Sequence, residues 1–251
     1  MKIVTDCAAD LPAQELEELG ITQAQLFIQF PEGEVNSADL TADEFYDRLE
    51  AMRPVIPSTA QPSSGVFSGI YRKLAEKGKS ILSIHVSSGL SGTVNSARLG
   101  SEETREAEVN VWDSMTLSGG QRFQVLAAAM AARTGWSVKA ILERLDQIRH
   151  HTEVVYTLDT LEYLARGGRI GRVQALAGTL LKIKPVITVD HTDGKYSTVS
   201  KGRTIAQSLD LIGDYLQRKA GDQPQWVTVL HGRFHESADA LTEVLKKKIN
   251  V

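Results

Sequence analysis

Cysteine is almost absent from this chain of 251 residues, because Cys7 is its only one. A single cysteine excludes disulfide bonds within the chain. No apolar run reaches the length of a membrane span, and the opening residues, Met-Lys-Ile-Val-Thr-Asp, lack a signal-peptide pattern. Neither sign of charge dominates: the formal net charge at pH 7 is −3, which gives no general attraction to nucleic acid or to an anionic membrane. We therefore expect a cytoplasmic protein that does not bind nucleic acid.

Two nucleotide-binding fingerprints are also missing. The chain has no G-x-x-x-x-G-K-[ST] phosphate-binding loop, and no G-x-G-x-x-G follows a predicted strand. A metal site is not expected either. His231 and His235 have the spacing of metal ligands on a helix, but His231 is predicted to end a strand, which removes the shared helix face. We expect neither a cofactor nor a bound metal.

Apolar residues make up 42% of the chain, enough for one large domain or two of ordinary size. In the first part, short apolar runs at 3–5, 81–86 and 109–112 predict strands. They alternate with segments such as 120–133 whose apolar spacing predicts helices. Alternating strands and helices are typical of a mostly parallel sheet. We predict an α/β fold whose N-terminal domain, residues 1–152, contains this sheet.

The pattern changes after residue 152. Runs at 184–189 and 195–199 predict two strands, and the Asp193-Gly194 pair between them predicts a hairpin turn. A further strand is expected at 226–230, and helices at 161–166, 169–182, 204–219 and 236–248. Strands paired in hairpins are typical of α+β domains. We predict a C-terminal α+β domain at 153–251, with a ligand pocket between the two domains.

The most informative segment is the serine-rich stretch Ser87–Ser96. It contains four serines, one threonine and two glycines, and it lies where the strand at 81–86 meets a predicted helix start. Ligands of α/β proteins bind at such carboxyl ends of strands. Glycine lets the backbone approach a ligand closely, and a helix N-terminus favours an anion. The segment predicts an anion site, although a serine-capped helix start would produce a similar pattern.

Two weaker candidates contain the same kinds of groups. Ser58 and Thr59 lie in a turn-rich stretch, 54–62, immediately before another predicted helix; a helix cap held between prolines is the simpler explanation. The segment 166–172 places three arginines around paired glycines, an arrangement that can hold a phosphate or carboxylate. A glycine helix stop with solvated arginines is the alternative there.

Two other functions remain open at this point. The run Gly89-Leu-Ser91-Gly-Thr93 nearly matches the G-x-S-x-G nucleophile motif, so Ser91 could serve an acyl ester hydrolase if His85 or His231 acted as its base. The final glycine of the motif is replaced by Thr93. Alternatively, Arg166, Arg169 and Arg172 could bind a phosphate or nucleotide.

Several motifs together resemble those of the DegV family. They are Val4-Thr5-Asp6-Cys7-Ala8-Ala9-Asp10-Leu11-Pro12, Ser58-Thr59-Ala60-Gln61-Pro62, the Ser87–Thr93 turn, Leu158-Asp-Thr-Leu-Glu-Tyr-Leu-Ala-Arg-Gly-Gly-Arg-Ile170, Leu180-Leu-Lys-Ile-Lys-Pro-Val-Ile187 and Lys201-Gly-Arg203. They occur in the family's order over essentially the whole chain. The resemblance implies a two-domain α/β protein that holds one long-chain fatty acid in a deep pocket. It also implies the lipid-binding subunit of a bacterial fatty acid kinase, in which a separate protein uses ATP to phosphorylate the carboxylate for phospholipid synthesis.

The resemblance also implies roles for individual residues. It places the fatty-acid carboxylate on the hydroxyls of Thr59 and Ser91, with Ser88 and the backbone around Gly92 as neighbours. Arg169 corresponds to a family arginine near the pocket mouth that meets the kinase or the phosphate. A binding subunit of this kind has no catalytic residue of its own, and its partners are the fatty acid, the kinase and, transiently, a membrane surface.

Two departures from the family pattern stand out. Cys7 occupies a position where serine is usual, a small change in size. The family also ends with a His-x-Gly-Pro-Gly segment whose histidine belongs to the carboxylate network, and this segment has no counterpart before Val251. We expect its loss to affect carboxylate affinity and kinase coupling more than the fold. His231 is the candidate substitute.

The chemistry of a fatty acid suits these residues. A carboxylate taken from water must be met by hydrogen bonds or charge, and hydroxyls with helix-start N–H groups provide them. Each buried methylene contributes roughly 0.8 kcal/mol, so most affinity should come from the tail. We predict that the pocket lining draws on apolar residues of the first domain: Phe27, Ile28, Phe30, Val66, Phe67, Ile70 and the alanine-rich helix.

Overall fold

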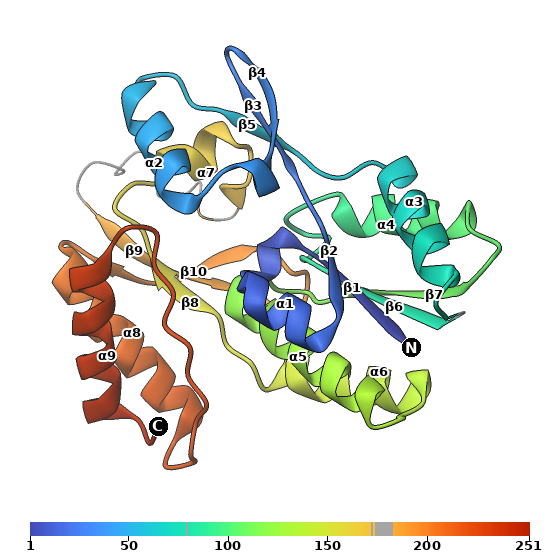
Figure 1. Ribbon diagram of the computed structural model, residues 1–251. Coiled ribbons are helices and arrows are strands. Elements are labelled where there is room, and N and C mark those ends of the chain that lie inside the picture. Colours follow the sequence, from blue (N-terminus) through green and yellow to red (C-terminus); the bar gives the residue numbers. More distant parts are fainter. Residues whose placement is uncertain (79, 172, 174–182) are drawn as a thin grey trace. The chain divides into compact units, whose positions relative to one another are not determined.

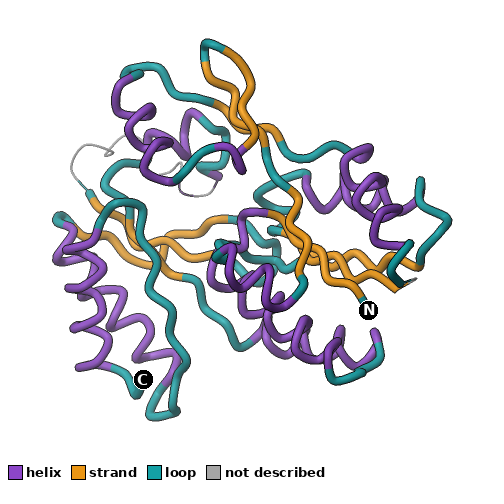
Figure 2. Tube along the Cα trace, in the orientation of Figure 1, coloured by secondary structure: helices purple, strands orange, loops and turns teal. Residues whose placement is uncertain are grey.

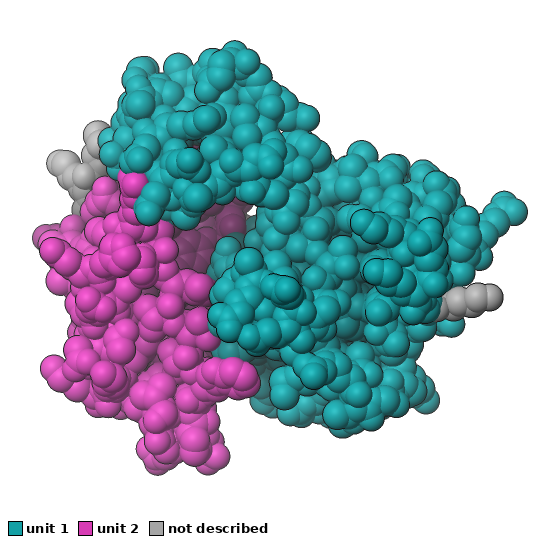
Figure 3. Space-filling view, in the orientation of Figure 1, with its two compact units in different colours: residues 1–152, 191–194 teal, residues 153–190, 195–251 magenta. Residues whose placement is uncertain are grey.

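The computed structural model describes residues 1–78, 80–171, 173 and 183–251. The chain forms two compact units, coloured separately in Figure 3. The first contains residues 1–152 and 191–194, and the second contains residues 153–190 and 195–251. Most of the predicted helix at 169–182 lies outside the described residues, and so does the predicted site residue Arg172.

The first unit is built on a four-stranded parallel sheet. Its strands are β1 (Lys2–Asp6), β2 (Ile21–Ala24), β6 (Ser80–His85) and β7 (Glu108–Asp113), in the order β2-β1-β6-β7. The two central strands are buried along almost their whole length, as expected for a parallel sheet covered on both faces. The predicted α/β fold class, with its mostly parallel sheet, is confirmed.

Helices cover both faces of this sheet (Figures 1 and 2). On one face, Ile3 and Leu82 pack with apolar residues of α1 (Ala13–Leu19), α5 (Ser118–Arg133) and α6 (Val138–His150). On the other face, Val4 and Ile81 pack with α3 (Ser64–Ala75) and α4 (Thr93–Glu102). Neighbouring residues of one strand therefore serve opposite cores, which explains why these strands read as continuous apolar runs.

The strand order creates a switch point between β1 and β6. From β1 the chain continues to β2 on one side, whereas β6 and then β7 extend the sheet on the other side. At such a point the connections leave the sheet in opposite directions and open a crevice at the carboxyl ends of the strands, where ligands of α/β proteins bind. The Ser87–Thr93 turn follows β6 at this edge.

A small antiparallel sheet also belongs to the first unit. It consists of β3 (Phe27–Phe30), β4 (Gly33–Asn36) and β5 (Ser58–Ala60), in the order β4-β3-β5. Helix α2 (Ala42–Ala51) follows β4 and begins with the capping box of Thr41 and Glu44. The stretch 54–62, predicted to be only turn-rich, therefore contains a strand. Three residues between two prolines carry too little periodicity to reveal one.

The second unit contains a three-stranded antiparallel sheet and two long helices. Strands β8 (Val155–Thr157), β9 (Lys184–Val189) and β10 (Tyr196–Gly202) pack against α8 (Ile205–Ala220), which also contacts α9 (His235–Lys248). The short helix α7 is Glu162–Arg166. The predicted hairpin between β9 and β10 is confirmed. Among the described residues, no helix has both the length and the apolar character needed to span a membrane.

The strand predicted at 226–230 is wrong. This segment has no regular secondary structure, and the side chain of Trp226 is 76% exposed. Alternating apolar residues form a strand only where a neighbouring strand supplies backbone partners and a surface to pack against. Sequence periodicity carries no information about whether that neighbour is present.

Candidate functional site

The candidate site lies at the carboxyl ends of the neighbouring strands β1 and β6. The strands are parallel neighbours, with Thr5 beside Ile84. The next residues along each strand, Asp6 and His85, therefore meet across the sheet. The backbone continues from His85 into the Ser87–Thr93 turn and then into α4, so the turn is anchored at the switch point of the sheet.

The turn is organised by hydrogen bonds within its own backbone and hydroxyls. The N–H groups of Leu90 and Ser91 donate to the carbonyl of Ser87 at 3.0 and 3.1 Å. The Ser91 hydroxyl lies 2.8 Å from the hydroxyl of Thr93 and accepts the Thr93 N–H at 3.3 Å. Ser91 thus satisfies one of the N–H groups that every helix start leaves without an intrahelical partner. Its side chain remains half-buried, while Ser88 and Gly92 are exposed.

Thr59 lies on β5, opposite Ile28 of β3. Directly opposed side chains of an antiparallel pair lie on the same face, roughly 5 Å apart at Cβ. Thr59 is exposed and Ile28 is buried. Thr59, which is predicted to bind the carboxylate, and Ile28, which is predicted to line the pocket, are therefore immediate neighbours.

Gln61 connects the Thr59 segment to the Ser91 turn. Its side-chain amide lies so close to Gly92 that a Cβ atom there would be 2.5 Å from Gln61 Nε2. The same nitrogen lies within 3.4 Å of the Ser96 hydroxyl on α4. Gln61, two positions after Thr59, is thus in contact with Gly92, the residue after Ser91. The structure brings together the two hydroxyl clusters that the sequence singled out, while their roles as ligands stay predictions.

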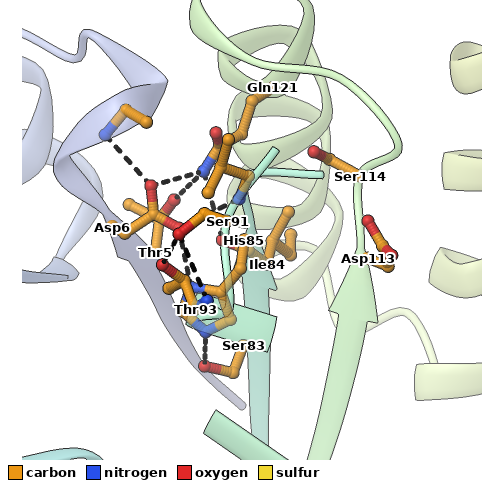
Figure 4. A network of polar contacts seen from close by, with 12 residues as sticks. Thr5, Asp6, Ser83, Ile84, His85, Ser91, Thr93, Asp113, Ser114 and Gln121 are labelled. Carbon is orange, nitrogen blue, oxygen red and sulfur yellow. Dashed lines mark hydrogen bonds and ion pairs between the residues drawn. The ribbon is translucent and has the colours of Figure 1, made fainter. Parts of the chain in front are cut away.

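A chain of buried polar side chains ends at the carboxylate of Asp6, and Figure 4 shows its members Ser83, His85 and Asp6. The Tyr71 hydroxyl donates to Ser83 Oγ at 2.9 Å, Ser83 Oγ lies 2.6 Å from His85 Nε2, and His85 Nδ1 lies 2.9 Å from Asp6 Oδ2. We call this set the buried relay: Tyr71, Ser83, His85 and Asp6. Burial raises the pKa of Tyr71 above its usual value, so its hydroxyl stays protonated and donates.

The Asp6 carboxylate is fully engaged. Besides His85, it accepts the N–H groups of Ala8 and Val86 at 3.0 Å each and the Gln121 amide at 3.2 Å. A buried carboxylate requires such compensation. Sequence reasoning missed this network. The available signal was two polar residues, Ser83 and His85, on the same face of an otherwise apolar strand.

The hydrolase alternative loses one of its two candidate bases. His85 has no exposed surface, and both of its ring nitrogens are occupied within the buried relay. It is therefore unable to take a proton from Ser91 in this arrangement. His231 belongs to the second unit, where its exposed ring lies 4.2 Å, centroid to centroid, from that of His235.

The arginine–glycine segment forms a helix stop in the second unit. Arg166 pairs with Glu162 within α7 at 2.8 Å, and Arg169 donates to the Gly167 carbonyl at 2.6 Å. Gly168 adopts the left-handed conformation, with φ of 72°. Both arginines are exposed. Arg172, the third arginine of the predicted phosphate site, lies outside the described residues, so that site stays a prediction.

The predicted lining residues differ in their surroundings. Ile28 and Phe30 are buried, while Phe27 is partly exposed. Phe67 is completely buried between the rings of Tyr71 and His85, and Ile70 packs against the same core. Any contact of Phe67 with a ligand would be made from within this core, and the lining role stays a prediction. The described residues contain no cluster of three metal-ligating side chains.

Comparison with known proteins gives a consistent family. The model of the DegV family, described as "Uncharacterised protein, DegV family", matches residues 1–251. A DegV domain-containing protein of Deinococcus radiodurans is 34% identical over 244 residues, which cover 97% of this chain and 83% of that protein.

Solved structures are similar along the whole chain. One is a DegV family protein from Thermus thermophilus described by its fatty acid binding, with a TM-score of 0.86 and 30% identity, covering 100% of this chain and 89% of that one. Another is DegV from Bacillus subtilis, described as a fatty acid binding protein, with a TM-score of 0.87 and 30% identity, covering 99% and 89%.

Proposed function

The chain belongs to the DegV family, and we propose that it binds a long-chain fatty acid whose carboxylate is held by the hydroxyls of Thr59 and Ser91. The observation that carries the proposal is the contact of Gln61 with Gly92, because it places the two hydroxyl segments side by side at the switch point of the parallel sheet. The relatives from Thermus thermophilus and Bacillus subtilis, described as binding fatty acids, support the same ligand class.

Two hydroxyls and a helix start are suited to a carboxylate. A carboxylate moved out of water needs several hydrogen bonds to remain ionised. Hydrogen bonds to a charged group contribute roughly 1.5–3 kcal/mol each. Ser91 already lies at the N-terminus of α4, where the helix dipole favours negative charge. The carboxylate would thus be oriented by Ser91 and Thr59, with Ser88 and Gly92 nearby, and no cofactor is needed.

The acyl tail supplies most of the affinity in this proposal. About fourteen buried methylenes would contribute on the order of 11 kcal/mol before the entropy of binding is subtracted. Ile28 lies next to Thr59 across the small sheet, so an apolar surface begins beside the head group. The tail then continues along further apolar residues of the first unit, including Phe27 and Ile70.

We further propose that the protein presents the fatty acid to a separate ATP-dependent kinase. The carboxylate would become an acyl phosphate on the partner, and this chain would contribute no catalytic residue. Arg169 is exposed and follows a helix stop, a position from which it can meet a partner or a phosphate. The substitute role of His231 in the carboxylate network stays part of this proposal.

Lipid extraction tests the ligand. The purified protein is extracted with organic solvent and the extract is analysed by mass spectrometry; we expect close to one long-chain fatty acid per chain. The delipidated protein is then titrated with palmitate as the wild type, as the double variant Thr59→Ala/Ser91→Ala, and as the control Ser101→Ala, which removes a hydroxyl farther along α4. The double variant should bind far more weakly, and the control should bind like the wild type.

Two results would contradict the proposal. A gently purified protein with no fatty acid, which also fails to bind added palmitate, would exclude the ligand class. Wild-type affinity in the double variant would move the carboxylate to other residues. Labelling of Ser91 by a fluorophosphonate probe would instead favour a hydrolase.

A further inference from the structure

We propose that the buried relay positions the Ser91 and Thr59 hydroxyls for the carboxylate, an inference that rests on the proposed function. The relay itself contacts no ligand, because Tyr71, Ser83 and His85 have no exposed surface. Its two ends lead instead to the two hydroxyl segments. It would thus set the distance and direction of the head-group contacts rather than form them.

One end of the relay is two hydrogen bonds away from Ser91. Asp6 Oδ2 accepts the N–H of Val86 at 3.0 Å, at the last residue before the turn. The next residue, Ser87, accepts the N–H of Ser91 on its carbonyl at 3.1 Å. A shift of the Asp6 carboxylate therefore moves the backbone that carries the Ser91 hydroxyl.

The other end leads to the Thr59 segment. Tyr71 lies on α3, which begins at Ser64, three residues after Gln61. The bond from Tyr71 to Ser83 fixes α3 on β6. Close packing assists it, since a Cβ at Gly100 of α4 would lie 2.7 Å from the Ser64 carbonyl. The relay thus joins the helix that follows Thr59 to the strand that precedes Ser91.

The hydrogen bonds of the relay all run in one direction. Tyr71 donates to Ser83, so the Ser83 hydrogen is available for His85 Nε2, and the Nδ1–H of His85 donates to Asp6. In this order each donor of the relay has an acceptor within the relay. Chains of this kind polarise one another and fix geometry more sharply than apolar packing does.

The test compares two ligands with the same tail. Delipidated wild type, Tyr71→Phe and the control Tyr215→Phe are titrated with palmitate and with 1-hexadecanol, which lacks the charged head group. Tyr71→Phe removes one hydroxyl and keeps the ring, while Tyr215 donates to Glu153 in the second unit. We expect about fivefold weaker palmitate binding in Tyr71→Phe, corresponding to one lost hydrogen bond, and unchanged hexadecanol binding. The control should leave both affinities unchanged.

A second variant tests whether the relay acts as a unit. Ser83→Ala removes the hydrogen-bond partner of both the Tyr71 hydroxyl and His85 Nε2, so its palmitate affinity should fall further. The double variant Tyr71→Phe/Ser83→Ala should lose less than the product of the two single losses, because both changes break the same bond. The melting temperature of each ligand-free variant is measured alongside.

Each outcome has one meaning. Equal weakening of palmitate and hexadecanol binding would show that Tyr71 only stabilises the fold. An unchanged palmitate affinity in both single variants would show that packing alone positions the hydroxyls. Either result overturns the proposal that the buried relay positions Ser91 and Thr59. A wild type that binds no palmitate overturns the proposed function itself, which the wild-type titration reveals before any variant is measured.

Discussion

The Ser87 hydroxyl donates to the backbone carbonyl of Gly194 at 2.8 Å, which ties the start of the Ser87–Thr93 turn to a residue 107 positions further along the chain. Gly194 ends the tip of the hairpin between β9 and β10, and the tip, residues 191–194, belongs to the first compact unit. The Ser87–Thr93 turn is therefore held from two sides: by Asp6 through Val86, and by the hairpin tip through Ser87.

Replacing Gly194 by alanine should loosen this attachment. Gly194 has φ of 66°, and a Cβ there would overlap the Ser87 hydroxyl. We expect a loss of unfolding free energy of about 2–4 kcal/mol, from left-handed strain together with the clash, and weaker palmitate binding. Urea denaturation and titration measure the two effects.

Gly168→Ala is the matched control for Gly194→Ala. Gly168 has a similar φ of 72° but nothing within 4 Å of a Cβ, so only the strain of about 1–2 kcal/mol should remain. If both variants lose the same stability, the contact with Ser87 contributes nothing.

Gly92→Ala should separate binding from stability. A Cβ at Gly92 would meet the end of the Gln61 side chain, which is flexible, and the φ of −76° at Gly92 suits any residue. We expect the unfolding free energy to change by less than about 1 kcal/mol, while palmitate binding weakens because the Thr59 segment is displaced from the turn. Wild-type affinity in this variant would show that the contact of Gln61 with Gly92 is dispensable.

The hydroxyl of Ser68 predicts a stabilising substitution. Ser68 lies within α3 and is 1% exposed, and its hydroxyl has no hydrogen-bond partner among the residues that the structure describes. Removing an unsatisfied buried group and adding the helix propensity of alanine should raise the unfolding free energy of Ser68→Ala by about 1 kcal/mol. Ser208→Ala is the contrast, because the buried Ser208 hydroxyl donates to the Lys184 carbonyl at 2.5 Å. Its loss should destabilise the protein; a destabilised Ser68→Ala would contradict the argument.

The sequence predicted those parts of the fold that local patterns determine. Apolar runs located β1, β6 and β7, and the Asp193-Gly194 pair located the β9–β10 hairpin. Each signal lies within a few neighbouring residues. The strand expected at 226–230 failed because pairing depends on a distant partner.

The sequence identified the segments of the candidate site but not the contacts between them. Glycine and hydroxyl content pointed to the turn at 87–93 and to Ser58-Thr59, but the contact of Gln61 with Gly92 joins residues 31 positions apart, which no local pattern encodes. The bond between Asp6 and His85 spans 79 positions. It follows from the pairing of β1 with β6, and the sheet order was not predicted.

Asp10 gives a prediction on pH. Burial raises the pKa of its carboxyl, a nearby Asp6 adds to the rise, and the Ser118 hydroxyl, 2.5 Å away, opposes it. A carboxyl whose pKa is higher in the folded state favours folding when protonated, so its contribution falls as pH rises through the interval above the unfolded value of about 4. Asp10→Asn should therefore be more stable than the wild type at pH 7, and asparagine, like aspartate, adopts the φ of 50° at this position. Thermal unfolding from pH 4 to 8 should show the gain shrinking toward acid; a gain that does not change with pH would contradict this account.

Arg169→Ala should affect a partner more than the fatty acid. Arg169 is exposed and donates a hydrogen bond to the nearby Gly167 carbonyl. Its removal should therefore leave the melting temperature within about 1 °C and palmitate affinity unchanged, as expected for a surface change below 0.5 kcal/mol. In a reconstituted reaction with a fatty acid kinase and ATP, acyl-phosphate formation should fall severalfold at subsaturating protein and recover partly as its concentration rises. Arg166→Ala, which breaks an exposed pair with Glu162 on the same short helix, is the control and should behave like the wild type. Equal losses of lipid binding and of transfer in Arg169→Ala would assign the guanidinium to the ligand network instead.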